Sequence, residues 1–151
     1  MPPTFQAYTS QGDKFVMDYK RLLTPPFSCK AVFKGITTWS EDRAKYNVII
    51  KFTPTYCGDA QQKLSNMKLA PFLWFCKHME SVGMYMVVTD YKAGKCVGIT
   101  LNEHARQLQE AIKTLHDANY VCGDLWGLNL LITADGLKIV DLDWCGKVGT
   151  A

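Results

Sequence analysis

The residues best suited to chemistry are Asp124, Asn129 and Asp141, in the last third of the chain. The segments that carry them occur in a particular order. An Asp-x4-Asn loop comes after a long amphipathic stretch, two short apolar runs follow it, and Asp141 closes the second run. Carboxylate and amide oxygens can hold Mg²⁺ on phosphate groups while another carboxylate orients a hydroxyl acceptor. Asp-x4-Asn alone is typical of many surface loops, so the interpretation depends on all the parts occurring in this order.

The surrounding segments are predicted to be a helix and a hairpin that position these residues. Apolar residues recur at helical spacing from Leu101 through Asn119, behind a capping box of Thr100 and Glu103. Residues 129–132 and 137–141 are two short apolar strands, and the Thr-Ala-Asp-Gly between them is typical of a tight turn. A hairpin of this kind returns its two ends, which carry the candidate metal ligands, to the same place.

This order of parts resembles the catalytic and metal-binding loops of the protein kinase superfamily. It is closest to divergent kinase-like domains of the type found in fungi, and to choline and aminoglycoside kinases, which use a Gly-Asp-Leu loop. The resemblance implies that Asp124 is the catalytic carboxylate and that Asn129 and Asp141 bind Mg²⁺. Asp143 would be a further ligand or a group that contacts the ligands. It also implies ATP-dependent phosphotransfer to a hydroxyl acceptor, first a protein Ser or Thr and otherwise a small molecule.

An upstream lysine fits the same resemblance. Val-Ile-Ile-Lys51 places an amine in an apolar strand that follows a strand hairpin, as does the family's third-strand lysine, which pairs with nucleotide phosphates. The alternative is a strand lysine whose stem crosses apolar neighbours to reach water. Asp90 and Tyr91 begin a connector that resembles the hinge that holds adenine through its backbone.

The predicted fold class is α+β and protein-kinase-like: a small antiparallel β-sheet lobe with one short helix over residues 15–91, then a truncated helical lobe. Residues 1–14 are predicted to be a flexible lead-in, and residues 92–151 a hinge and partial second lobe. Residues 15–23 fit a helix and a strand equally well. The other predicted elements of the first lobe are strands 30–38 and 46–53, a short helix within 59–68, and strands 72–77 and 83–89.

Several features depart from the family pattern. The stretch between the first two strands has two prolines and no glycine, and Asp59 is the only acid on the short helix that could pair with Lys51. Cys122 stands where protein kinases have histidine, and Trp126 where they have a phosphate-neutralising lysine. The chain ends ten residues after Asp141. A truncated kinase-like domain with impaired turnover is therefore expected, with an exposed apolar helix face that a protein partner could cover.

Two other functions stay open. A pseudokinase or protein-interaction module would keep the fold and lack turnover, and the missing glycines favour it. In a metal-dependent glycosyltransferase, Asp141-Leu-Asp143 would be a DxD motif, although Lys51 and Asn129 would then be coincidental.

Composition bears on the partners and the cellular compartment that can be expected. Net charge is only +3 and the basic residues are scattered, which argues against a nucleic-acid partner. No apolar run approaches the roughly 20 residues that a membrane span requires. The six cysteines show no metal-ligand spacing, and the first residues are not typical of a secretory signal. We therefore expect an intracellular protein, cytoplasmic or nuclear, with reduced thiols.

Overall fold

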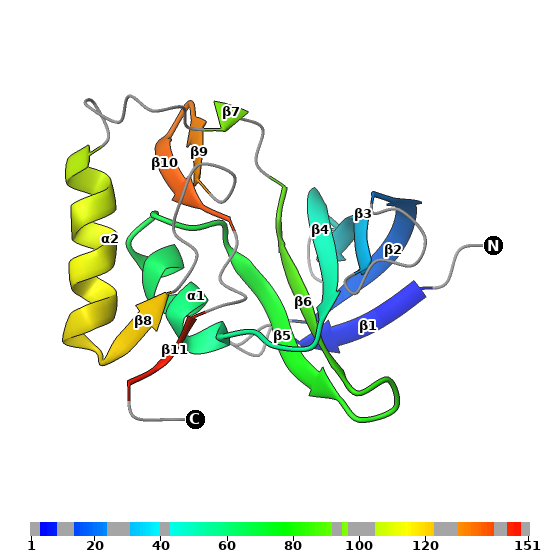
Figure 1. Cartoon of the computed structure of the whole chain (residues 1–151). Coiled ribbons are helices and arrows are strands. Elements are labelled where there is room, and N and C mark those ends of the chain that lie inside the picture. Colours follow the sequence, from blue (N-terminus) through cyan, green and yellow to red (C-terminus); the bar gives the residue numbers. More distant parts are fainter. Residues whose placement is uncertain are drawn as a thin grey trace. The chain divides into compact units, whose positions relative to one another are not determined.

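A computed structural model divides the chain into two compact units (Figure 1). The first comprises Met1–Thr55 with Leu73–Tyr91, and the second comprises Tyr56–Phe72 with Lys92–Ala151. The residues that the structure describes are 4–8, 14–23, 31–39, 43–91, 95–96, 105–122, 130–140 and 145–148.

The first unit is one antiparallel sheet of six strands in the order β1-β2-β3-β4-β6-β5. The order places β4 between β3 and β6, so its backbone is paired along both edges. The strands are β1 (Thr4–Tyr8), β2 (Lys14–Leu22), β3 (Ala31–Trp39), β4 (Lys45–Thr53), β5 (Leu73–Met79) and β6 (Met84–Asp90).

The N-terminal part of this sheet differs from the sequence-based expectation. Thr4–Tyr8 is strand β1, paired residue by residue with β2, so the prediction of a flexible lead-in over residues 1–14 is wrong for these five residues. The ambiguity over residues 15–23 is settled in favour of a strand. Phe15 and Met17 are fully buried and alternate with partly exposed neighbours, as in a strand with one face on a core. The other four strands of the sheet agree with the predicted ranges to within two residues.

An aromatic cluster forms the core on one face of the sheet. Trp74 is 2% exposed, and its ring centroid lies 5.3 Å from that of Phe15 and 4.8 Å from that of Trp39. Offset and edge-on contacts of this kind add to the stabilisation that comes from burying the rings. The Trp74 Nε1–H donates a 2.6 Å hydrogen bond to Oδ1 of Asp90, which satisfies the polar end of the buried indole.

The second unit packs two helices against short strands. One apolar core joins α1 to α2 and to β8, β9 and β10. The elements are α1 (Gly58–Asn66), β7 (Lys95–Cys96), α2 (Ala105–Asp117), β8 (Tyr120–Cys122), β9 (Leu130–Thr133), β10 (Gly136–Ile139) and β11 (Cys145–Lys147). Buried members of the core include Ala60, Leu64, Ala111, Leu115, Leu130, Leu137 and Ile139.

The apolar face of α2 is more covered than the sequence suggested. Ala111 and Leu115 are 0% and 1% exposed and belong to the shared core, and Leu108 packs against it. The expected bare stripe is therefore wrong for these residues. The covering comes partly from α1, which the sequence had placed with the first lobe.

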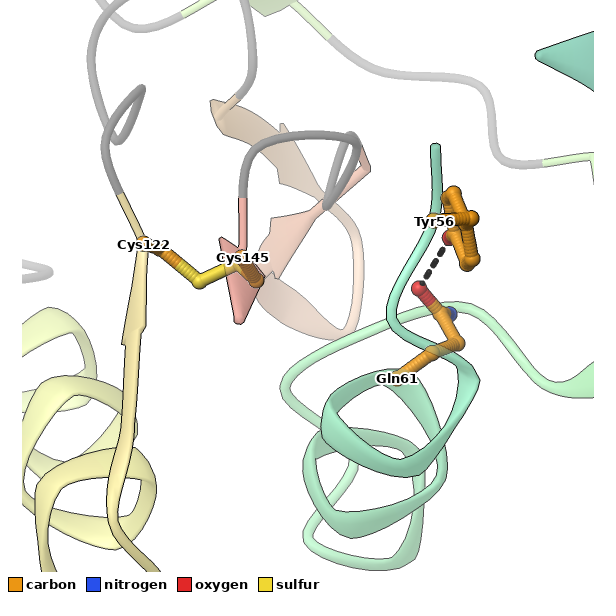
Figure 2. Close-up of a disulfide and its surroundings, with 4 residues drawn as sticks. All are labelled: Tyr56, Gln61, Cys122 and Cys145. Carbon is orange, nitrogen blue, oxygen red and sulfur yellow. Dashed lines mark hydrogen bonds between the residues drawn. A yellow bond between two sulfur atoms is a disulfide. The ribbon is translucent and has the colours of Figure 1, made fainter. Parts of the chain in front are cut away.

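The expectation of reduced thiols is also wrong for two cysteines. Cys122 on β8 and Cys145 on β11 form a disulfide (Figure 2). No local sequence pattern indicates this pair, because the two residues are 23 positions apart and only the pairing of β8 with β11 brings them together. In the part of the chain that the structure describes, no helix is long and apolar enough to cross a bilayer.

Candidate functional site

Lys51 lies on the central strand β4, on a half-buried face of the first unit. Its direct cross-strand partners are Val32 on β3 and Val87 on β6, so its side chain emerges between two apolar neighbours. Lys51 is itself partly buried. A lysine in this setting presents one ammonium group beside two apolar side chains. Such an arrangement can contact both the phosphate and the aromatic base of a nucleotide.

The same face carries a second amine that sequence reasoning missed. Lys34 on β3 lies opposite Ile49, two positions along β4 from Lys51, so the two lysines share one face of the sheet. The Lys34 Nζ lies 4.8 Å from the ring centroid of Tyr91, in a cation–π contact. The register of the predicted hairpin, counted outward from its turn, could have placed Lys34 beside Lys51.

The two residues expected at the hinge are partly engaged within the sheet. The Asp90 carboxylate accepts the hydrogen bond from Trp74, and the backbone N–H of Tyr91 donates to the Asn47 carbonyl at 3.0 Å. This backbone bond extends the pairing of β6 with β4 by one residue. Tyr91 is 44% exposed, so any contact of a base with this residue would use its carbonyl oxygen or its ring.

The first turn of α1 is a small polar cluster within the second unit. The Tyr120 hydroxyl, on β8, donates to Oδ2 of Asp59 at 3.3 Å. Burial raises the pKa of the Tyr120 hydroxyl, and the nearby Asp59 carboxylate raises that pKa further. Asp59 is the acid that the sequence offered as an ion-pair partner for Lys51. Within the second unit, the structure gives Asp59 a hydrogen bond with Tyr120.

Gln61 fixes the same helix to its surroundings. Although only 1% exposed, its side chain accepts a 2.8 Å hydrogen bond from the Tyr56 hydroxyl (Figure 2) and donates a 2.7 Å bond to the Pro71 carbonyl. Both bonds satisfy an otherwise costly buried amide. The Gln61 side chain thus links Tyr56, which precedes α1, to Pro71, which follows it.

The β9–β10 hairpin is anchored by hydrogen bonds to α2 and to the segment that follows α1. The Leu137 backbone N–H donates to the Gln107 side chain on α2 at 3.1 Å. On the other side, the Ile139 N–H donates to the Leu69 carbonyl at 2.8 Å, and the Lys138 ammonium donates to the Lys68 carbonyl. Lys138 is only 4% exposed, and a buried lysine is tolerated only where its charge finds polar partners.

The hairpin itself matches its prediction. Gly136 has a φ of +105° and closes a two-residue turn of Ala134 and Asp135 between the paired residues Thr133 and Gly136. Since Leu130 and Ile139 are direct partners at the open end, the chain enters and leaves the hairpin side by side.

Four predicted site residues lie outside the described residues: Asp124, Asn129, Asp141 and Asp143. Within the described ranges, no group of three His, Cys, Asp or Glu side chains is arranged to hold a metal ion. The assignment of the catalytic and metal-binding residues therefore remains a prediction from the sequence.

Comparison with known proteins places this geometry in a known class of fold. No family description and no curated protein matches the sequence. Among solved structures, the kinase PK-1 of Cydia pomonella granulovirus matches with a TM-score of 0.66 over 89% of this chain. The fold is kinase-like.

The kinase-like fold confirms the predicted α+β class, with its antiparallel sheet followed by a small helical part. Identity to PK-1 is 18%, and the chain spans 56% of the length of that kinase. The relation to fungal-type domains or to choline kinases stays a prediction.

Proposed function

We propose that this kinase-like chain binds ATP with Mg²⁺ and serves phosphotransfer to a hydroxyl group, first that of a protein Ser or Thr, with a small-molecule hydroxyl as the other acceptor. The observation that carries the proposal is the half-buried Lys51 on the central strand of a kinase-like sheet, flanked by Val32 and Val87. An ammonium group there would neutralise phosphate charge while the apolar neighbours contact the base.

The hairpin supports the metal-binding half of the proposal. Asn129 immediately precedes Leu130, and Asp141 follows Ile139 by two residues. Because Leu130 and Ile139 are directly paired, the chain enters and leaves the hairpin at the same end, which supports a metal site shared by the residues just before and just after it. Their oxygens, with that of Asp143, are the hard ligands that Mg²⁺ prefers. Bound metal would supply charge neutralisation on the transferred phosphoryl group.

The proposed reaction assigns one step to each group. Asp124 would orient the acceptor hydroxyl and take its proton as the oxygen forms a bond to the γ-phosphorus. The bond from that phosphorus to the bridging oxygen breaks, and ADP leaves with its charge balanced by Lys51. The kinase-like fold favours this reaction over the sugar-nucleotide alternative, which rested on Asp141-Leu-Asp143 alone.

A thermal-shift experiment tests the proposal. At about 100 times its dissociation constant, ATP with Mg²⁺ should stabilise the chain by about 2.7 kcal/mol. For a chain of this size, that corresponds to roughly 5–10 °C in melting temperature. Asp141→Asn and Lys51→Met should each remove most of the shift. Asp135→Asn, at the exposed turn of the same hairpin, is the matched control and should keep it. The absence of any shift in the unmodified chain would refute ATP binding.

A pseudokinase without turnover is the second candidate, and the Tyr120–Asp59 hydrogen bond favours it. That bond engages Asp59, the acid in the first turn of α1. In this case the fold would persist, and saturating ATP with Mg²⁺ would leave the melting temperature unchanged. Phosphotransfer to a generic substrate, measured beside binding, separates a binding-only protein from an active one.

A further inference from the structure

The Cys122–Cys145 disulfide joins the two ends of the segment that contains every candidate catalytic and metal-binding residue of the second unit. The two cysteines are direct partners in the pairing of β8 with β11 and stand 23 positions apart in the sequence. Asp124, Asn129 and Asp141 all lie between them, as does Asp143. The bond therefore closes the proposed catalytic and metal-binding loops into one covalent ring (Figure 2).

The sheet that carries this bond is small. Strands β8 and β11 pair over three residues each, and one further hydrogen bond joins the Val148 N–H to the Asn119 carbonyl at 2.6 Å. Tyr120 and the two cysteines contact the core of the second unit, whereas Val121 and Val148 remain 47% and 60% exposed, so apolar burial reinforces only part of this pairing. A two-stranded sheet of this size is marginally stable in water. The covalent bond is therefore a major constraint on the separation of the two strands.

The position of the bond also suits exchange with small thiols. Both cysteines are only partly buried, and the exposed Val121 directly precedes Cys122. On their inner side, Cys122 and Cys145 pack against the core that joins α1, α2 and the β9–β10 hairpin. Both cysteines are thus partly exposed to solvent. Formation or reduction of the bond would act on β8 and β11, the strands next to the proposed loops.

We propose that Cys122 and Cys145 are a reversible redox site whose oxidised form binds ATP with Mg²⁺ more tightly than its reduced form does. The oxidant is a low-molecular-weight disulfide of the glutathione class. The effect on nucleotide binding rests on the proposed function, whereas the redox reaction itself does not.

The reaction is a pair of thiol–disulfide exchanges. The Cys122 thiolate attacks one sulfur of glutathione disulfide, forming a mixed disulfide and releasing one glutathione thiolate. The Cys145 thiolate then attacks the Cys122 sulfur, so that the protein disulfide forms and a second glutathione leaves. The two protons lost by the cysteines are taken up by the two glutathione thiolates. Excess reduced glutathione runs the same steps backwards.

The first measurement is the redox equilibrium of the purified chain. The protein is held in buffers with a series of ratios of reduced to oxidised glutathione, and its thiols are then alkylated and identified by mass spectrometry. Cys122 and Cys145 should pass together between protected and alkylated states, with the same midpoint from either direction. Failure to form the bond, or failure of glutathione to reduce it, would overturn the proposal.

Hydrogen exchange then tests what the bond does to the loops. On reduction, amides of residues 123–144 should exchange at least about threefold faster, while those of α1 and α2 should lose part of their protection but stay measurably protected. Equal exchange in both states would show that the bond constrains nothing. Complete loss of protection in α1 and α2 would mean that the disulfide is structural rather than a switch. Either result rejects the proposal.

Nucleotide binding gives the final test. The dissociation constant of ATP with Mg²⁺ should be at least about threefold lower for the oxidised chain than for the reduced chain, because the covalent ring leaves the chain between the two cysteines less conformational freedom to lose on binding. The variant Cys122→Ser/Cys145→Ser should behave as the reduced chain in every buffer, and Cys57→Ser, which leaves the disulfide intact, should respond as the unmodified chain does. Equal affinities in the two states would disprove the coupling. If neither state binds ATP, the proposed function fails, and the redox and exchange measurements still decide the redox site.

Discussion

At the scale of single residues, burial and neighbouring groups decide what each side chain can do. Cys57 shows this, since it lies at the start of α1 and packs against the core of the second unit. Burial raises the pKa of its thiol, and backbone hydrogen bonding to Ala60 opposes that rise only in part. The thiol of Cys57 is therefore expected to react slowly, although it lies close to the acid Asp59.

This raised pKa predicts slow alkylation of Cys57. An ordinary thiol with a pKa of about 8.5 is roughly one-tenth thiolate at pH 7.5. The folded chain should have a smaller thiolate fraction at this position, so Cys57 should react with iodoacetamide more slowly in the folded chain than in urea. The folded-state rate should keep rising at pH values where the rate in urea has already levelled off, about one unit above the unperturbed pKa. Mass spectrometry identifies the labelled site, and equal rates in both states would contradict the prediction.

The raised pKa has a consequence for stability with a definite sign. The folded chain holds the Cys57 proton more tightly than the unfolded chain does. Its contribution to stability is therefore complete below the unfolded pKa and is lost as pH rises through the folded value.

At the scale of elements, close contacts between strands set the geometry of the sheet that carries Lys51. Gly35 on β3 is the tightest of these points. A Cβ atom added there would lie 2.6 Å from Cδ1 of Ile50 and 2.7 Å from the Asp18 carbonyl oxygen. The second neighbour is backbone and cannot rotate away. Glycine is therefore required where β2, β3 and β4 approach one another.

Gly35→Ala should consequently destabilise the chain. Overpacking of a filled core costs about 1–3 kcal/mol, and the clash with backbone places this substitution toward the upper end. Gly146→Ala is the matched control, because no atom lies within 4 Å of the Cβ position there. Urea unfolding of both variants checks the prediction. It would be wrong if the two alanines cost the same.

At the scale of the whole molecule, the disulfide is expected to stabilise one of the two units and not the other. The bond lies entirely in the second unit, whereas the six-stranded sheet and its aromatic core lie in the first. Closing a loop between Cys122 and Cys145 removes conformational freedom from the unfolded chain. For a loop of this length, the chain-entropy estimate is about 3 kcal/mol.

Reduction should therefore lower the stability of the second unit and spare the first. Hydrogen exchange followed in increasing urea reports the two separately, through the amides of α2 and those of β4. The expected result is a loss of about 3 kcal/mol for α2 on reduction and little change for β4. An equal loss in both units would mean that they unfold as one, and no loss would mean that the bond does not stabilise the fold.

Local patterns in the sequence determined much of this protein. Runs rich in β-branched and aromatic residues placed strands β3 to β6, the Asp-Gly pair placed the β9–β10 turn, and helical spacing placed α2. Lys51 was correctly placed in an apolar strand that follows a hairpin. These features follow from side-chain periods of two or 3.6 residues and from turn chemistry, which act over a few positions and are legible in one sequence.

Only the tertiary structure decided which distant residues meet. The strand nature of Thr4–Tyr8, the joining of α1 to the second unit, the Tyr120–Asp59 hydrogen bond and the Cys122–Cys145 disulfide all depend on contacts between segments far apart in the sequence. Such contacts are selected by the packing of whole elements, because each element must bury its apolar face against another. The sequence alone thus determined the candidate chemistry and its order along the chain, and the fold decided which of those groups are already held by other partners.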